Sequence, residues 1–273
     1  MDTFLDENLT RYQLASSSEG TDINWLFLPG GPGCDSSIFN DLINSLKLPG
    51  KCWLIDFPGN GTNNKHVSDE YDFNQWDDCL ATAVARFENP VLIGHSFGGM
   101  FPLLFPELEK SLKGLVILSS APKLWHEATY KMGMEMNKPN LEIPMDAFVN
   151  NPNNETFKTA LLACAPYYFA DEFLEVGKKF LEKLDCNYKA AVWWQKKAIE
   201  IQFDAKWIPQ AVPTLIICGS QDCVCPSTLF ENDTRFQRPN ITLKTIQDAG
   251  HIVWLEKPEI VQNCFKDFLK LIQ

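Results

Sequence analysis

The chain alternates short, uninterrupted apolar runs with longer segments in which apolar residues recur every three or four positions. The apolar runs predict buried strands at residues 23–28, 52–57, 91–93, 115–118 and 213–218, and we expect a further strand at 241–246. The helical spacing predicts helices near residues 38–46, 74–87, 97–109 and 228–236, and a terminal helix that begins at Pro258. Strands that are apolar throughout and alternate with helices are typical of a parallel sheet covered on both faces. We therefore predict an α/β fold with a mostly parallel central sheet.

Residues 1–22 follow a different pattern. Apolar and polar residues alternate over short segments such as residues 9–14, which predicts antiparallel edge strands joined by a turn at residues 16–20. The acidic start of the chain, residues 1–7, lacks a basic segment followed by an apolar one. We therefore expect no signal peptide.

The alternation of strands and helices breaks between residues 123 and 207. This stretch has no clear buried strand, and its helical segments are separated by loops rich in proline and asparagine. We predict a helical cap at 123–207, inserted between core segments 1–122 and 208–273 and lying over the carboxyl edge of the sheet. Its many aromatic residues indicate a partly apolar substrate, or packing of the cap's own small core.

Composition narrows the class of protein. The 273 residues are 45% hydrophobic and 22% charged, typical of one large globular domain or one domain with an insertion. The net charge of −11 argues against a nucleic-acid surface, which is expected to be basic. No apolar stretch is long enough to span a membrane. Nine cysteines without the density of a disulfide scaffold favour a reduced, cytoplasmic protein.

A Cys-x-Cys pair, Cys223 and Cys225, is the one feature that suggests a metal. Zinc sites in proteins need a second pair of Cys or His ligands at suitable spacing, and the sequence has none. We expect no metal and no organic cofactor.

The main candidate for chemistry is Gly94-His95-Ser96-Phe97-Gly98, which follows an apolar run and precedes a helical segment. It fits G-x-S-x-G, the nucleophile elbow, in which a serine sits on a sharp turn from strand to helix. Small residues are needed on either side because strand and helix backbones approach closely there. Ser96 is therefore a candidate nucleophile, the alternative being a serine in an ordinary turn.

A serine nucleophile needs a base, and the base needs an acid that orients it. Asp222 follows the strand predicted at 213–218, and His251 follows the strand predicted at 241–246, so both fall at the active edge. The other histidines lie in a loop, in the elbow and in the cap, namely His66, His95 and His126. We expect His251 to be the base and Asp222 the acid, with Asp248 as an alternative acid and a structural turn as an alternative role for Asp222.

Acyl transfer also needs donors for the developing oxyanion. The N–H of Phe97, directly after the nucleophile, is one candidate. The loop Pro29–Gly33 follows the strand at 23–28, and the N–H of Gly31 is the expected second donor. The alternative interpretation of this loop is a plain turn.

Together these segments resemble the α/β-hydrolase superfamily. Residues 56–61 are similar to its D-x-x-G-x-G loop, and residues 251–258 to its H-x-x-x-x-E-x-P ending. Within the superfamily, residues 30–33 resemble the H-G-G-P-G loop of proline iminopeptidases, with Pro29 in place of the histidine. That resemblance implies acidic cap residues that hold a substrate amino group. The possible counterparts are Glu172, Glu175 and Glu182.

The combined pattern predicts a serine hydrolase that cleaves a small ester or amide with a partly apolar acyl group through an acyl-enzyme. It would act as an esterase or resemble a proline iminopeptidase, on a small molecule or short peptide. Two alternatives remain open: a lyase that uses the same triad as a proton shuttle, and a non-catalytic ligand receptor of the same fold.

Overall fold

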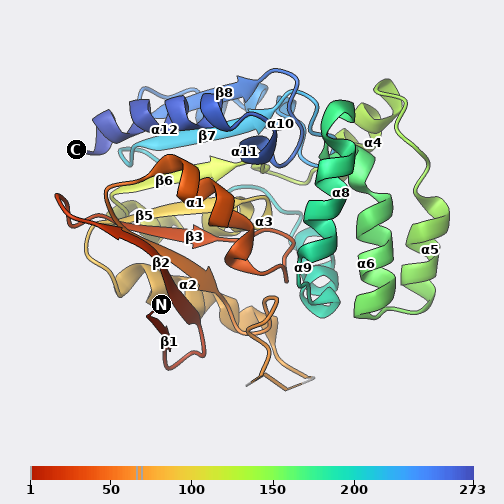
Figure 1. Ribbon diagram of the computed structural model, residues 1–273, viewed down its shortest axis with the longest axis horizontal. Helices are drawn as coiled ribbons and strands as arrows, with labels where there is room; N and C mark the ends of the chain where they lie inside the picture. Colours follow the sequence, from red (N-terminus) through yellow and green to blue (C-terminus); the bar gives the residue numbers. More distant parts are fainter. Residues whose placement is uncertain (1, 66, 69) are drawn as a thin grey trace.

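The computed structural model describes residues 2–65, 67–68 and 70–273. In this part of the chain, the strands form one eight-stranded sheet in the order β1-β2-β4-β3-β5-β6-β7-β8 (Figure 1). The strands are β1 (Thr3–Leu5), β2 (Arg11–Ser18), β3 (Asn24–Leu28), β4 (Gly50–Asp56), β5 (Pro90–His95), β6 (Gly114–Leu118), β7 (Thr214–Gly219) and β8 (Ile241–Ile246). Strands β3 to β8 pair in parallel, and β1 and β2 are antiparallel additions at one edge. The predicted mostly parallel α/β sheet is confirmed.

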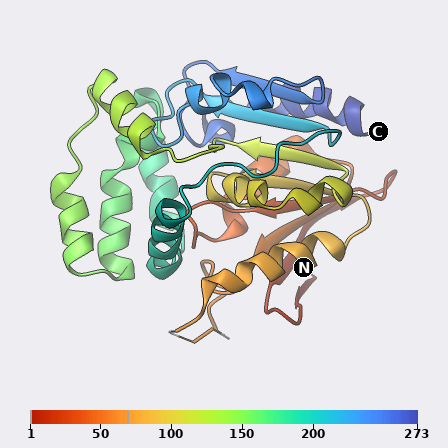
Figure 2. The ribbon, with the colours of Figure 1, turned by 180° about the vertical axis from the view of Figure 1, so that it is seen from behind.

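Helices cover both faces of this sheet, as Figures 1 and 2 show from opposite sides. One face carries α1 (Asn40–Leu46), α11 (Val253–Glu256) and α12 (Pro258–Ile272), and the other carries α2 (Trp76–Ala85), α3 (Phe97–Met100) and α10 (Thr228–Glu231). Successive strand residues point to opposite faces. In β5, Val91 and Ile93 accordingly enter the cluster under α12, whereas Leu92 enters the cluster under α2. This two-sided burial explains the uninterrupted apolar runs.

The segment between β6 and β7 forms a group of helices at the carboxyl ends of the parallel strands (Figure 1). We call this group the helical layer. Its members are α4 (His126–Glu135), α5 (Glu142–Asn150), α6 (Asn154–Ala163), α7 (Ala165–Tyr168), α8 (Leu174–Lys183) and α9 (Tyr188–Glu200). Phe169 and Leu181 of this segment extend one apolar cluster of the core, and Trp194 extends the other. The layer is therefore packed onto the active edge rather than suspended above it.

The prediction of a single helix at residues 97–109 is wrong. The chain forms the short α3, then two 3₁₀ turns at Phe101–Leu104 and Pro106–Lys110. Pro102 and Pro106 lack the N–H that a continuing helix needs. Phe105, which precedes a proline, leaves the helical region with φ −119° and ψ 88°.

The turn predicted at residues 16–20 is also misplaced, because β2 continues to Ser18. The turn between β1 and β2 lies instead at residues 6–10. There, Oδ1 of Asp6 accepts hydrogen bonds from the N–H groups of Asn8 and Thr10, each at 2.9 Å. Leu9 adopts a left-handed conformation with φ 61°. The hydrogen bonds between Asp6 and the backbone of its own turn favour a turn at residues 6–10 more strongly than the serines and glycine favour one at residues 16–20.

Candidate active site

Ser96 lies at the sharp turn between β5 and α3 with φ 52° and ψ −119°, a backbone conformation that non-glycine residues rarely adopt. A Cβ on Gly94 would overlap the carbonyl oxygen of Gly98, and one on Gly98 would overlap that of Leu28. The hydroxyl of Ser120 donates a 2.7 Å hydrogen bond to the carbonyl of Ser96. Close backbone packing therefore holds the strained turn that the G-x-S-x-G pattern predicts.

Asp222 and His251 come together because β7 and β8 are neighbouring parallel strands whose carboxyl ends lie side by side. Nδ1 of His251 lies 2.7 Å from Oδ2 of Asp222, and both side chains are buried. Oδ1 of Asp222 accepts hydrogen bonds from the N–H groups of Val224, at 2.8 Å, and Cys225, at 2.9 Å. Asp248, the alternative acid, is exposed, and its Oδ1 accepts a bond from the Gln221 amide at 3.3 Å.

The pairing with Asp222 decides what the other ring nitrogen of His251 can do. A carboxylate only accepts hydrogen bonds, so Nδ1 carries the proton and Nε2 keeps a lone pair in the neutral ring. Within the described residues, Ser96 Oγ makes no hydrogen bond to this nitrogen, and the Ser96 side chain lies beside the Cys225 thiol. Hydrogen bonds of this kind are often loose until a substrate is bound.

The loop Pro29–Gly33 lies directly against Ser96. A Cβ built on Gly30 would come within 2.9 Å of the Ser96 Cβ, and Gly31 has φ +114°. In the described part of the chain, the N–H groups of Gly31 and Phe97 donate no hydrogen bond. Two unused backbone N–H donors therefore belong to the residue after Ser96 and to the loop that packs against Ser96.

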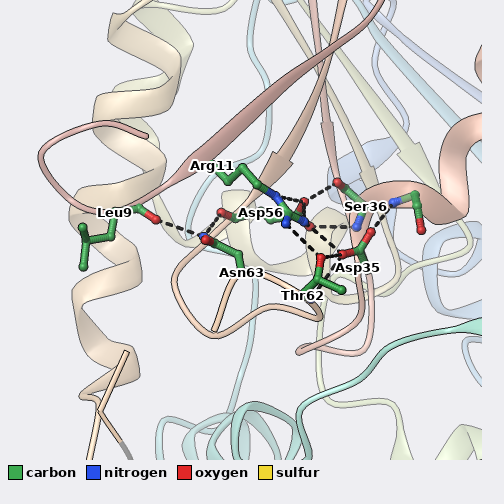
Figure 3. A network of polar contacts seen from close by, with 8 residues as sticks. Leu9, Arg11, Asp35, Ser36, Asp56, Thr62 and Asn63 are labelled. Carbon is green, nitrogen blue, oxygen red and sulfur yellow. Dashed lines mark hydrogen bonds and ion pairs between the residues drawn. The ribbon is translucent and has the colours of Figure 1, made fainter. Parts of the chain in front are cut away.

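A partly buried ion-pair network joins Asp35 and Ser36, just after this loop, to Arg11 and Asp56 (Figure 3). The Arg11 guanidinium contacts Oδ2 of Asp56 at 2.6 Å and Oδ2 of Asp35 at 2.9 Å. Asp56 also accepts bonds from the N–H and hydroxyl of Ser36 at 2.7 and 2.6 Å. Burial raises the pKa of Asp56 to about 6, despite the attraction of Arg11. The network links β2, β4 and the residues after the loop. The D-x-x-G-x-G pattern includes only one member of this network, Asp56.

His95 packs against His251. Its Nε2 donates to the backbone carbonyl of His251 at 3.3 Å, and the two rings lie 4.7 Å apart. Burial, followed by repulsion from His251, holds the pKa of His95 well below its usual value. His95 is therefore a neutral support for the His251 loop, a contact that its position in the elbow did not reveal.

The helical layer contacts the loops that carry both partners. The N–H of His251 donates to the carbonyl of Tyr168 at 2.6 Å, and the N–H of Cys223 donates to that of Tyr167 at 3.1 Å. The Tyr168 ring stands perpendicular to the His251 ring, with centroids 5.1 Å apart. Nothing in the sequence pattern around residues 167–168 singles out this contact.

Glu256 also connects the helical layer to the loop of His251. Its carboxylate accepts hydrogen bonds from the N–H of Gly250, directly before His251, and from the N–H of Ala170 in the layer, each at 3.1 Å. Burial raises the pKa of Glu256 to about 7. The H-x-x-x-x-E-x-P pattern was the available signal for this residue.

Two aromatic side chains of the helical layer pack against Phe97, the residue after Ser96. The Phe97 ring lies 5.0 Å from that of Trp194 and 6.4 Å from that of Trp193, both in α9. Ser96 is 9% and His251 1% exposed, so both residues are almost fully removed from solvent.

The model of the alpha/beta hydrolase family matches residues 25–261, which is most of the chain and includes Ser96, Asp222 and His251. The chain belongs to the alpha/beta hydrolase family.

Several relatives of this alpha/beta hydrolase carry esterase names. It is 26% identical over 255 residues to the Pimeloyl-[acyl-carrier protein] methyl ester esterase of Wigglesworthia glossinidia brevipalpis, with 91% of this chain and 94% of the relative covered. It is 22% identical over 264 residues to the putative esterase/lipase 2 of Mycoplasma genitalium, with 90% and 88% covered. The solved structure of a thermophilic esterase aligns with TM-score 0.68 and 19% identity, covering 99% of this chain and 97% of that one, and shows the shared fold.

The finer resemblance to proline iminopeptidases is not confirmed by these relatives. The three candidate acidic residues are also exposed at the surface. Glu172 is exposed and pairs with Lys257, Glu175 is exposed and pairs with Lys178, and Glu182 is exposed.

Within the described ranges, no cluster of three or more His, Cys, Asp or Glu side chains could hold a metal ion. Cys223 lies 3.4 Å from the sulfur of Met136, whereas Cys225 faces Ser96, so the Cys-x-Cys pair does not converge. Over the same part of the chain, we find no helix with the length and apolar character needed to cross a bilayer.

Proposed function

We propose that this chain is a serine esterase that hydrolyses a small carboxylic ester with a partly apolar acyl group. The observation that carries the proposal is the buried Asp222–His251 hydrogen bond beside a serine held in a strained elbow. This is the arrangement of nucleophile, base and orienting acid that acyl transfer needs.

In the proposed reaction, Ser96 Oγ attacks the ester carbonyl while Nε2 of His251 takes its proton. Asp222 holds the imidazole in the required tautomer and stabilises the imidazolium. The N–H groups of Gly31 and Phe97 bind the oxyanion, and loss of one such donor typically costs about 10²- to 10³-fold in rate. His251 then protonates the departing alcohol, and water attacks the acyl-enzyme by the reverse use of the same groups.

An ester is favoured over a peptide with a free amino terminus. The candidate acidic residues of the layer are exposed, and the rings nearest Phe97 are apolar. The esterase names of the relatives support the same choice.

The helical layer is the proposed cap, corresponding to residues 123–207, with core segments 1–122 and 208–273. Its contacts with the Asp222 and His251 loops, and the burial of Ser96, support a role in covering the substrate.

The first test is covalent labelling by a fluorophosphonate probe. The folded wild-type protein should label at Ser96, and Ser96→Ala should not label while keeping its melting temperature. Absence of labelling in the folded wild type would remove the serine-hydrolase proposal and favour a ligand receptor.

The second test separates the remaining chemistries. Short p-nitrophenyl esters should be cleaved faster than proline arylamides, with no advantage for a free amino terminus. Hydrolysis in ¹⁸O-labelled water should place the label in the acid product. A product without label would favour the lyase alternative.

A further inference from the structure

Two cysteines from distant parts of the chain face each other where the helical layer meets the oxyanion loop. Cys34 follows Gly33 of the loop, and Cys186 lies two residues before the start of α9. They form an isolated antiparallel bridge with the two sulfur atoms 2.9 Å apart. All nine cysteines of the chain are free thiols in the structure.

The backbone around the bridge defines the pairing geometry. The N–H of Asp35 donates to the carbonyl of Asp185 at 3.1 Å, and the N–H of Asn187 donates to that of Gly33 at 3.0 Å. These flanking bonds make Cys34 and Cys186 a non-hydrogen-bonded pair, whose Cα atoms are typically about 4.5 Å apart with side chains close together. That separation is within the range of about 4.4–6.8 Å that a disulfide needs.

The two thiols differ in access. Cys186 is partly buried and lines a cavity of about 480 Å³ together with Gly59, Phe73 and Asn187, whereas Cys34 is buried. The hydrogen bond to Cys186, followed by burial, raises the pKa of the Cys34 thiol well above its usual value. A reagent in the cavity therefore reaches Cys186 first.

We propose that Cys34 and Cys186 are an oxidisable dithiol that a small-molecule disulfide converts into a disulfide fastening the helical layer to the oxyanion loop. The Cys186 thiolate attacks the reagent, forming a mixed disulfide and releasing one thiol. The Cys34 thiol then loses its proton and attacks the Cys186 sulfur, which releases the second thiol. The protein loses two hydrogens, and the reagent is reduced to two thiols.

The consequence for activity rests on the proposed function. Because Ser96 and His251 are nearly buried, a substrate reaches them only when part of the layer separates from the core. A covalent link at Cys34–Cys186 opposes separation at the edge where Asn187 binds Gly33 and, through its side-chain amide at 2.9 Å, the carbonyl of Gly59. Oxidation should therefore slow turnover reversibly.

The experiment treats the wild-type protein with oxidised glutathione and then maps its peptides under non-reducing conditions. We expect a Cys34–Cys186 linkage, a melting temperature raised by roughly 5 °C or more because a long loop is closed, and ester turnover reduced about tenfold. Dithiothreitol should restore all three. A different linkage, or none, would overturn the site, and the linkage with unchanged turnover would overturn the latch.

Matched variants separate the pair from other thiols. Cys186→Ser should keep its basal turnover and lose the response to oxidised glutathione, whereas Cys264→Ser, on α12, should respond as the wild type does. Persistence of the response in Cys186→Ser would contradict the assignment. The linkage and the melting temperature are read without activity, so they test the dithiol even if no ester is hydrolysed.

Discussion

A methyl group added to the backbone meets very different neighbours at the Ser96 elbow and in the helical layer. On Gly98 it would overlap the carbonyl oxygen of Leu28, at the end of the adjacent strand β3. On Gly133, in α4, it would lie 2.6 Å from the ring of Tyr167, a side chain that can rotate. Backbone packed against backbone therefore fixes the elbow, whereas side chains support this part of the layer.

The same contrast extends to what each region exposes. The side chains of Ser96, Asp222 and His251, which follow β5, β7 and β8, are buried. Asp222 and His251 are hydrogen-bonded to each other, and the backbone carbonyl of Ser96 accepts a bond from Ser120. The outer helix α5 exposes apolar side chains, with Ile143 84% and Val149 68% exposed. The difference indicates that packing and hydrogen bonds hold Ser96, Asp222 and His251 more tightly than the outer helix α5 of the layer.

The largest effect on activity is expected for a substitution of Asp222, which binds His251. In Asp222→Asn, the side-chain amide would face Nδ1 and favour the wrong tautomer of His251, so kcat should fall by roughly 10⁴-fold. Steady-state kinetics on a p-nitrophenyl ester, with the melting temperature measured alongside, checks this. The matched control is Asp248→Asn, in an exposed position, which should keep nearly full kcat. The reverse ranking would make Asp248 the acid.

Alanine at the two glycines tests the contrast directly. Gly98→Ala should lower the free energy of unfolding by about 3 kcal/mol or more, because a backbone carbonyl cannot move aside. Gly133→Ala should change it by less than about 1 kcal/mol, because the gain in helix propensity offsets the displacement of Tyr167. Urea unfolding of both variants gives the comparison. Equal stability of the two would show that the elbow is not fixed by its backbone.

The same contrast explains which features could be predicted from the sequence. The strands of the core were predicted because their burial on both faces leaves a continuous apolar run, as in Leu92 and Ile93. Ser96 and Asp222 could be nominated because each follows such a strand, and His251 because it follows the last predicted strand, although their catalytic roles stay predictions. The interruption of the helix after Ser96 was missed because the apolar spacing outweighed the signals from Pro102 and Pro106.

Contacts between the layer and the core could not be predicted, since they depend on tertiary packing that no local pattern records. The carbonyls of Tyr167 and Tyr168 bind the Cys223 and His251 loops through the backbone, so any residue type could supply them. Cys34 and Cys186 are 152 positions apart and become neighbours only in the folded chain. Glu256 alone belonged to a recognisable pattern.

The smallest effect is expected for a substitution of Glu256, which joins the loop before His251 to the helical layer. Burial raises its pKa to about 7, above the usual value of 4.5. Below about pH 4.5 the carboxyl is protonated in both the folded and unfolded states. Between pH 4.5 and 7 the unfolded state ionises first, so the stabilising contribution of the neutral folded carboxyl is lost as the pH rises through this window.

Glu256→Gln removes this titration, and its amide oxygen can still accept the N–H groups of Gly250 and Ala170. The free energy of unfolding of the variant should therefore rise relative to the wild type by about 2 kcal/mol between pH 4.5 and 7.5. Urea unfolding at several pH values measures the difference, with the exposed Glu182→Gln as a control that should give a flat difference. A flat difference for Glu256→Gln as well would mean that the carboxyl is already ionised in the folded state, held by its two backbone donors. The contact between layer and core at Glu256 would then be anionic and would not titrate near neutrality.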